Sequence, residues 1–374
     1  MWNLPDDLVR TLNQLTRPTP QPPAAPTPAP APKPEPPPKM EPDTLALQVP
    51  MTGAPRAAGP GAAIALQNVK SGWVKDPTFV ADGRKIGGQR YMAFGDLRNF
   101  HLKAFDVRGK GLEFKNGEVP IKIAGIPDKL DGRWAPQITV QGDRVIMLYC
   151  AGEMHPGEGI NWPSFRMRTA SVPLDEFAKA AKGGKPVTFK DHGVLFPDQT
   201  NFGGDSDFAM IDPHLHNTPD GKAFMTYTVV KAGIPGKRSH EEFIRIREVD
   251  PKNPAKAIGP DTPLVDGWAG APHHGVAEAQ ELVTIGGKQF LFISSRAGDI
   301  DQKVLVAPYK PGDKVPLPPS AFKPVMNPGG EGWKANAVGS TSTAVIEGKP
   351  YMLHQGLNSD KRFTLGWTSL ALDG

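Results

Sequence analysis

The chain has 374 residues, with 43 Lys and Arg against 39 Asp and Glu, which gives a net charge of +4. This charge is too small for a protein that binds nucleic acid through a concentrated basic face. No run of 18 apolar residues occurs, so the sequence contains no candidate membrane-spanning helix. The single cysteine, Cys150, excludes an intramolecular disulfide and any cysteine-rich metal site.

The first 17 residues form a segment of their own. Leu8, Leu12 and Leu15 recur at helical spacing, which predicts a short amphipathic segment over residues 1–17. This segment is either a frayed tail or a docking peptide that tethers the chain to a larger assembly, such as a virion or a surface. It lacks the cationic and apolar regions of a standard secretory signal. We therefore expect a cytoplasmic, virion-associated or non-classically exported protein.

A proline-rich stretch follows. Thirteen prolines fall within residues 18–42, and such a segment cannot donate a regular set of backbone hydrogen bonds. We expect a disordered, extended linker over residues 18–67. Its last part, from residue 43 to about 65, is interpreted either as linker or as a strand that leads into the next domain.

From residue 68 onward, short β-rich runs are each closed by a turn signal, as in antiparallel hairpins. Only residues 174–182 are predicted as a helix. Hairpins over about 300 residues predict an all-β fold, a five-bladed β-propeller at 68–374, with a pair of β-sandwiches as the alternative. The predicted strands are Tyr91–Phe94, Gln137–Val140, Val145–Tyr149, Ala223–Val230, Leu282–Ile285, Gln289–Ser294, Ser342–Ile346 and Tyr351–His354.

Three carboxylates occupy similar settings in successive parts of this region. Asp76, Asp212 and Glu278 each interrupt or end an apolar run just before a hairpin. An acid in an apolar strand costs free energy unless it is paired or hydrated. Because the inner strands of a propeller line one common channel, the three acids are expected to converge on one water-filled site. Taken singly, an Asp-Pro pair is also an ordinary turn or strand-entry signal.

The order of the motifs resembles glycoside hydrolase family 43, the five-bladed propellers that cleave arabinans and xylans. The resemblance covers about residues 68–374, and Gln280 stands where that family usually has proline. The segment 201–207 is a second departure. The matching motifs are Asp76-Pro77, Trp134-Ala135-Pro136, Ile211-Asp212-Pro213 with Asp220-Gly221-Lys222, Glu278-Ala279 ahead of Gln289–Ser294, and Tyr351-Met352-Leu353-His354.

The resemblance implies a role for each acid. Asp76 would be the general base that activates water, and Glu278 the general acid that protonates the leaving oxygen. Asp212 would orient the general acid and raise its pKa by like-charge repulsion. The family inverts the anomeric centre, which requires the base and the acid to be roughly 6.5–9.5 Å apart.

Four further residues are candidates for the site. Trp134 either walls the sugar pocket or packs between blades, and Arg296 and His274 are candidates for binding sugar hydroxyls. The resemblance places His354 beside the central channel, near water or an ion such as Ca²⁺, whereas a buried core histidine is the alternative. No cofactor is otherwise expected. His214 and His216 share a strand face with Asp212, which also allows a zinc site.

The sequence therefore predicts an inverting glycoside hydrolase for a pentose- or furanose-containing polysaccharide, resembling arabinan or xylan or belonging to a cell envelope. An arabinofuranosidase is one member of this class. The alternative is a non-catalytic propeller that binds glycans or attaches a particle to a surface. Fold alone does not separate the two, because one fold serves many functions.

Overall fold

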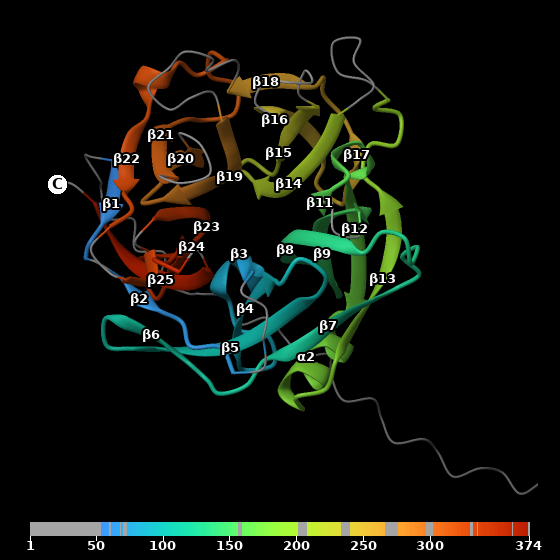
Figure 1. The fold of residues 1–374 in the computed structure, drawn as a ribbon, viewed down its shortest axis with the longest axis vertical. Helices are drawn as coiled ribbons and strands as arrows, with labels where there is room; N and C mark the ends of the chain where they lie inside the picture. The colour runs from blue at the N-terminus through green and yellow to red at the C-terminus, as the bar shows by residue number, and fades with distance from the viewer. Residues whose placement is uncertain are drawn as a thin grey trace, which may run out of the picture. The chain divides into compact units, whose positions relative to one another are not determined.

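The computed structural model describes residues 54–59, 61–67, 69, 73–155, 159–200, 208–232, 240–265, 276–296, 302–329, 332–334, 336–360 and 362–372. The predicted segment at 1–17 and most of the predicted linker lie outside these residues. Within them, antiparallel strands form five blades around a common axis, as Figure 1 shows. This arrangement confirms the predicted five-bladed β-propeller and excludes the pair of sandwiches.

Blades 1 and 2 share a nine-stranded sheet, because β7 of blade 1 pairs in parallel with β13 of blade 2. Blade 1 contains β3 (Lys75–Phe79), β4 (Arg90–Gly95), β5 (Phe100–Arg108), β6 (Gly111–Phe114) and β7 (Val119–Ala124). Blade 2 contains β8 (Gly132–Gln141), β9 (Arg144–Gly152), β12 (Arg166–Pro173) and β13 (Val187–Val194). A small hairpin joins β10 (Met154–His155) to β11 (Gly159–Ile160).

The remaining blades are separate sheets. Blade 3 contains β14 (Phe208–Asn217), β15 (Ala223–Ala232), β16 (His240–Asp250), β17 (Asn253–Ala257) and β18 (Thr262–Val265). Blade 4 contains β19 (Val276–Ile285), β20 (Lys288–Arg296), β21 (Lys303–Pro308) and β22 (Lys323–Met326). Blade 5 contains β23 (Ala337–Ile346), β24 (Lys349–Leu357), β25 (Phe363–Leu372), β1 (Pro55–Ala57) and β2 (Ala62–Ala63). Every strand predicted from the sequence lies within one of these strands.

Helices contribute little to the described residues. The predicted helix is α2 (Leu174–Lys182), which lies at the outer side of blade 2. Short 3₁₀ turns occur at Val80–Gly83, Trp162–Ser164, Pro319–Ala321 and Gly332–Lys334. None of the helices in the described part of the chain is long and apolar enough to cross a membrane.

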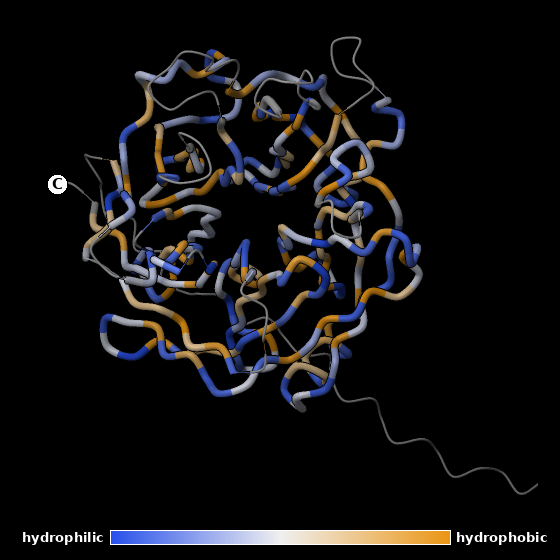
Figure 2. Tube along the Cα trace, in the orientation of Figure 1, coloured by the Kyte–Doolittle hydropathy of each residue, from blue (hydrophilic) through white to orange (hydrophobic). Residues whose placement is uncertain are grey.

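Hydrophobic side chains fill the space between neighbouring blades. Figure 2 shows hydrophobic segments interleaved with hydrophilic ones along the chain in each blade. Each of the five interfaces has its own buried cluster. Each cluster contains residues from both neighbouring blades. Going round from the interface of blades 1 and 2 to that of blades 5 and 1, examples are Phe100 with Met147, Met167 with Met210, Ile246 with Leu282, Phe292 with Val338, and Leu353 with Phe94.

The innermost strand of each blade contacts the innermost strands of both neighbours, so that β3, β8, β14, β19 and β23 form a closed ring. All five carry the same irregularity. The pairing register with the next strand shifts at one point, and a non-glycine residue there has a positive φ of 43° to 52°. These bulge residues are Asp76, Ala135, Asp212, Ala279 and Ser340.

The bulges bend each inner strand at the same level of the ring. In three of them the bulge residue is followed by proline, namely Pro77, Pro136 and Pro213, which has no N–H to offer to a ladder. The repeated Asp-Pro and Ala-Pro pairs are therefore marks of the bulges rather than of turns between strands.

An N-terminal strand closes the propeller. β1 pairs antiparallel with β25, the last strand of the chain, and thus supplies the outer strand of blade 5. Ala54 and Ala57 pack on the cluster that contains Leu370. Of the two interpretations for residues 43 to about 65, the strand applies at 55–57 and 62–63.

Removing residues 1–60 should lower the melting temperature by a few degrees, because the edge of β25 then becomes unpaired and Leu370 is exposed. Removing residues 1–50 keeps β1 and serves as the matched control, for which we expect no change. Thermal unfolding followed by circular dichroism measures both. Equal melting temperatures for the two truncated chains would contradict the closure by β1.

Candidate active site

The three acids come from blades 1, 3 and 4 and meet at the bulge level of the inner-strand ring. Asp76 and Asp212 are themselves bulge residues, and Glu278 immediately precedes the bulge residue Ala279. The carboxylates of Asp76 and Glu278 both act electrostatically on Asp212. The structure therefore brings together the three acids that the sequence predicted to converge.

Backbone N–H groups of the next blade hold two of the acids. Asp76 Oδ2 accepts a hydrogen bond from Ala135 N at 3.1 Å, and Asp212 Oδ2 accepts one from Ala279 N at 3.1 Å. In both cases the donor is the bulge residue of the following inner strand. The bulge residues thus supply both carboxyls, from Asp76 and Asp212, and both N–H donors, from Ala135 and Ala279.

Asp212 is the acid whose protonation the site alters. Removal from solvent is the largest cause, and the charges of Asp76 and Glu278 add to it, so the pKa of Asp212 is raised well above its ordinary value. The Lys75 ammonium and the hydrogen bond from Ala279 act in the opposite direction but are weaker. Repulsion among three carboxylates disfavours the state in which all are ionised. The group therefore retains a proton at a pH where isolated carboxyls have lost theirs.

Gln280 stands where the family has proline, and it fixes the position of Asp212. Gln280 Nε2 donates to the backbone carbonyl of Asp212 at 2.5 Å, and Gln280 Oε1 accepts from Thr228 Oγ1 at 2.8 Å. Thr228 Oγ1 lies 3.3 Å from Asp212 Oδ2. Thr228 thus connects the Gln280 amide to the Asp212 carboxyl.

Glu278 is held by a residue that sequence reasoning missed. Gln302 Nε2 donates to Glu278 Oε1 at 2.7 Å, and the Gln302 side chain is buried. It lies against Gly339, where an added Cβ would approach the Gln302 amide carbon at 2.5 Å. Gln302 is separated from Glu278 by 24 positions in the chain, and no local pattern in the sequence marks it.

A small cavity of about 50 Å³ runs along the axis at this level, lined by residues of all five bulges. The larger cleft of about 920 Å³ lies elsewhere, beside the 218–222 and 286–287 hairpin turns of blades 3 and 4. That cleft contains none of the three acids, and its lysines and carboxylates nearly balance in number. Two of the acids, Asp76 and Asp212, line the axial cavity together with Ala279, the chain neighbour of Glu278. The axial cavity is thus the better candidate for a reaction site.

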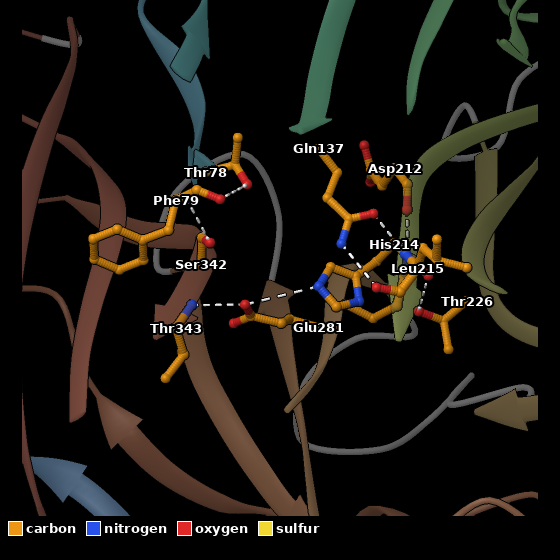
Figure 3. A network of polar contacts seen from close by, with 11 residues as sticks. Thr78, Phe79, Gln137, Asp212, His214, Leu215, Thr226, Glu281, Ser342 and Thr343 are labelled. Carbon is orange, nitrogen blue, oxygen red and sulfur yellow. Dashed lines mark hydrogen bonds and ion pairs between the residues drawn. The ribbon is translucent and has the colours of Figure 1, made fainter. Parts of the chain in front are cut away.

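A polar network lies beside the axial cavity, as Figure 3 shows. His214 Nε2 faces Glu281 Oε1 at 3.8 Å, and Glu281 Oε1 also accepts from Thr343 N at 2.6 Å. Gln137 accepts from Leu215 N through Oε1 and donates to Leu215 O through Nε2. Among the described residues, His214 Nδ1 and Glu281 Oε2 have no hydrogen-bond partner.

Burial keeps both members of the His214–Glu281 pair neutral. It lowers the pKa of His214 to about 3 and raises the pKa of Glu281 to about 8. For Glu281, the hydrogen bonds from Thr343 act against this rise and the Asp82 charge adds to it. The separation of 3.8 Å is too long for a direct hydrogen bond, in keeping with two uncharged groups.

Two of the weaker candidates, Trp134 and His354, are buried. The Trp134 side chain is only 6% exposed, and its ring stacks on that of Phe165 with the ring centres 4.2 Å apart. This burial agrees with packing within a hydrophobic cluster. Behind it, Cys150 donates its Sγ–H to the carbonyl of Trp134, and burial raises the pKa of that thiol well above its ordinary value. The buried thiol packs in the same hydrophobic cluster as Trp134.

His354 is fully buried and stacks on Trp333 at 5.1 Å. Burial lowers the pKa of His354 to about 3, and the Lys334 charge acts in the same direction. Neither ring nitrogen has a hydrogen-bond partner among the described residues. A neutral imidazole can bind an ion, but one histidine near a lysine cation is a poor cation site. The described residues include no cluster of three metal-ligating side chains.

Two predicted site residues cannot be placed. His274 lies in the segment 271–275, outside the described residues, as does the unusual segment 201–207. Arg296 ends β20, but its side chain is likewise outside them. Their roles in binding sugar remain predictions.

Comparison with solved structures identifies the class of fold. An exo-1,5-α-L-arabinanase from a bovine ruminal metagenomic library superposes with a TM-score of 0.55 at 14% identity, covering 80% of this chain and 97% of that one. The family-43 endo-arabinanase from Bacillus licheniformis gives 0.53 at 17% identity, with coverages of 83% and 98%. A family-43 enzyme from Xanthomonas citri in complex with xylotriose gives 0.53 at 14% identity, with coverages of 83% and 90%.

These similarities show that the chain has the propeller fold of family-43 glycoside hydrolases, as its motifs predicted. No protein-family model matches the sequence, and no curated protein matches it in sequence. At identities this low, the likeness establishes the fold, and function has to be argued from the site.

Replacing Glu281 by Gln should stabilise the protein at neutral pH. A buried carboxyl with a raised pKa lowers the free energy of unfolding as pH rises from about 4.5 to about 8, because only the unfolded chain releases the proton. The amide stays neutral and can still accept from Thr343 N. We expect a gain of about 2–3 kcal/mol at pH 7 and almost none at pH 4.5, measured by urea denaturation.

The matched control is Glu113→Gln, which removes one exposed carboxylate on β6. It should show no such dependence on pH. If Glu281→Gln changed the free energy of unfolding equally at pH 4.5 and pH 8, the raised pKa of Glu281 would be refuted.

Proposed function

We propose that the protein is an inverting glycoside hydrolase that acts on a pentose- or furanose-containing polysaccharide, such as arabinan, xylan or a cell-envelope glycan. The observation that carries the proposal is the meeting of Asp76, Asp212 and Glu278 at one level of the axial ring, with a proton retained among them. The shared fold with arabinanases and with an enzyme bound to xylotriose supports the choice of substrate class.

The chemistry needs one ionised and one protonated carboxyl at the same pH. Asp76 is the proposed base, and the N–H of Ala135 stabilises its ionised form. Glu278 is the proposed acid, whose carboxyl Gln302 orients. Asp212 is the proposed third acid, which keeps the proton within the group and binds the backbone N–H of Ala279, the residue next to Glu278.

Inversion follows if water attacks from the side opposite to the leaving group. Asp76 removes the proton from that water while Glu278 protonates the glycosidic oxygen, so that no covalent sugar–enzyme bond forms. At the end of one cycle, Asp76 carries the proton and Glu278 has lost one. Exchange of both protons with solvent restores the starting state.

The alternative is a propeller that binds glycans without cleaving them. It is favoured only by the predicted docking role of residues 1–17. A purely binding site gains nothing from three mutually repelling carboxylates, each of which costs free energy in the enclosed ring. We therefore place hydrolysis first.

A direct test is a hydrolysis screen on aryl arabinofuranosides, aryl xylosides, arabinan and xylan, with proton NMR of the first-formed anomer. Hydrolysis with inversion of the anomeric centre is expected. Products of retained configuration would refute the roles of Asp76 and Glu278. If none of these pentosides were hydrolysed, the binding propeller would become the better proposal.

Glu278→Gln should lower kcat by about 10²–10⁴-fold on polysaccharide, because general-acid assistance is lost. The loss should be much smaller on nitrophenyl glycosides, whose leaving group needs little protonation. Asp76→Asn is the matched variant and should lower kcat on both substrates alike, since water has to be activated in either case. Equal losses for Glu278→Gln on both substrates would exclude Glu278 as the acid.

Asp212→Asn should move the basic limb of the pH–rate profile to lower pH. Asp212 has the raised pKa within the group of three acids, and an amide at this position cannot carry the retained proton, so the group loses that proton at lower pH. The measurement is kcat/KM for an aryl glycoside across pH. An unchanged basic limb would show that Asp212 does not act on the acid.

A further inference from the structure

One aromatic side chain is exposed on the described surface close to the acids. Trp73 is 52% exposed, and Ile258 at 57% is the other large hydrophobic side chain that stands out among the described residues. Exposed hydrophobic groups of this size commonly mark contacts with a ligand or a partner. Trp73 precedes Asp76 by three residues, and three extended residues span at most about 10–11 Å.

Trp73 is held in place rather than free to rotate with a loose segment. It forms an isolated parallel β-bridge with Phe363, the first residue of β25. The two rings lie 5.3 Å apart with an angle of 41° between their planes. A ring fixed in this way loses little conformational entropy when a ligand stacks on it.

Lys75 contacts one of the two rings and acts through its charge on one of the acids. Lys75 Nζ lies 5.3 Å from the centre of the Phe363 ring. The charge of the same Lys75 acts on Asp212 and lowers its pKa against the larger effect of burial. The aromatic pair, the lysine and the carboxylates thus occupy one end of β3 in this order.

We propose that Trp73 and Phe363 form a sugar-binding platform, on which a neighbouring sugar of the same polysaccharide chain stacks while another occupies the acid site. The substrate class rests on the function proposed above. The CH face of a sugar ring suits an aromatic surface, and Lys75 can donate hydrogen bonds to its hydroxyls. The nearby carboxylates disfavour an anionic ligand, which makes a neutral glycan the matching occupant.

The platform predicts a preference for polymers over single sugars. An aryl monoglycoside fills only the acid site, whereas an oligosaccharide also reaches Trp73. Trp73→Ala should therefore raise KM for polysaccharide about tenfold and leave kcat/KM for an aryl monoglycoside unchanged. Trp73→Phe keeps an aromatic face and should retain most of the affinity.

Binding is measured separately from catalysis, in the full chain carrying Glu278→Gln, by affinity electrophoresis in gels containing soluble arabinan or xylan. Trp73→Ala should weaken retardation about tenfold, whereas Ile258→Ala, which removes the other exposed hydrophobic group, should not. Melting temperatures equal to that of the parent chain verify that the variants fold.

The outcomes separate the platform from the function. If the parent chain hydrolyses pentosides but Trp73→Ala binds and cleaves polymer as well as the parent does, the platform is wrong and the proposed function stands. If Ile258→Ala weakens binding as much as Trp73→Ala, the effect is not local and the platform is again wrong. Absence of both binding and hydrolysis for every glycan would overturn the platform together with the function.

Discussion

A circle of hydrogen bonds between successive inner strands constrains the centre of this propeller. At each blade interface, a side chain of one inner strand accepts a hydrogen bond from a backbone N–H of the next. In blade order, the acceptors and donors are Asp76 and Ala135, Gln137 and Leu215, Asp212 and Ala279, Glu281 and Thr343, and Ser342 and Phe79. Two of these bonds join bulge residues directly. In the other three, the acceptor lies two residues and the donor three residues beyond the bulge residue of its strand.

The proposed catalytic acids are members of this circle. Asp76 and Asp212 join blades 1 to 2 and 3 to 4, so the contact that closes the ring also fixes a carboxylate on the axis. Burial, with the like charges of Asp76 and Glu278 adding to it, raises the pKa of Asp212, so the three acids resist full ionisation. Glu281 is the acceptor between blades 4 and 5, two residues beyond the bulge residue Ala279, and burial makes it neutral. The hydrogen bonds of the ring thus join the blades, and the pKa values of Asp212 and Glu281 within it are raised.

The fold and the acids were predictable from the sequence because both leave local marks. Turn residues delimit each hairpin, and an acid beside proline in an apolar run is visible without a structure. The bulges were not recognised, although Ala135-Pro136 repeats the pattern of Asp76-Pro77 and could have revealed them. Gln302 and Glu281 could not be predicted, because Gln302 contacts a residue 24 positions away within blade 4, and Glu281 contacts a residue 62 positions away in blade 5. Trp73 likewise acquires a role only from its bridge to Phe363.

The central claim is that three carboxyls share an enclosed site and hold a proton between them. Carbon-13 NMR of the labelled Asp and Glu carboxyl groups, titrated in the full chain, tests this claim without requiring a substrate. Asp212 should titrate well above its ordinary range, and its pKa should fall in Asp76→Asn and again in Glu278→Gln, since each removes one repelling charge. An Asp212 pKa in the ordinary range, or one that neither substitution lowers, would contradict the convergence of the three acids.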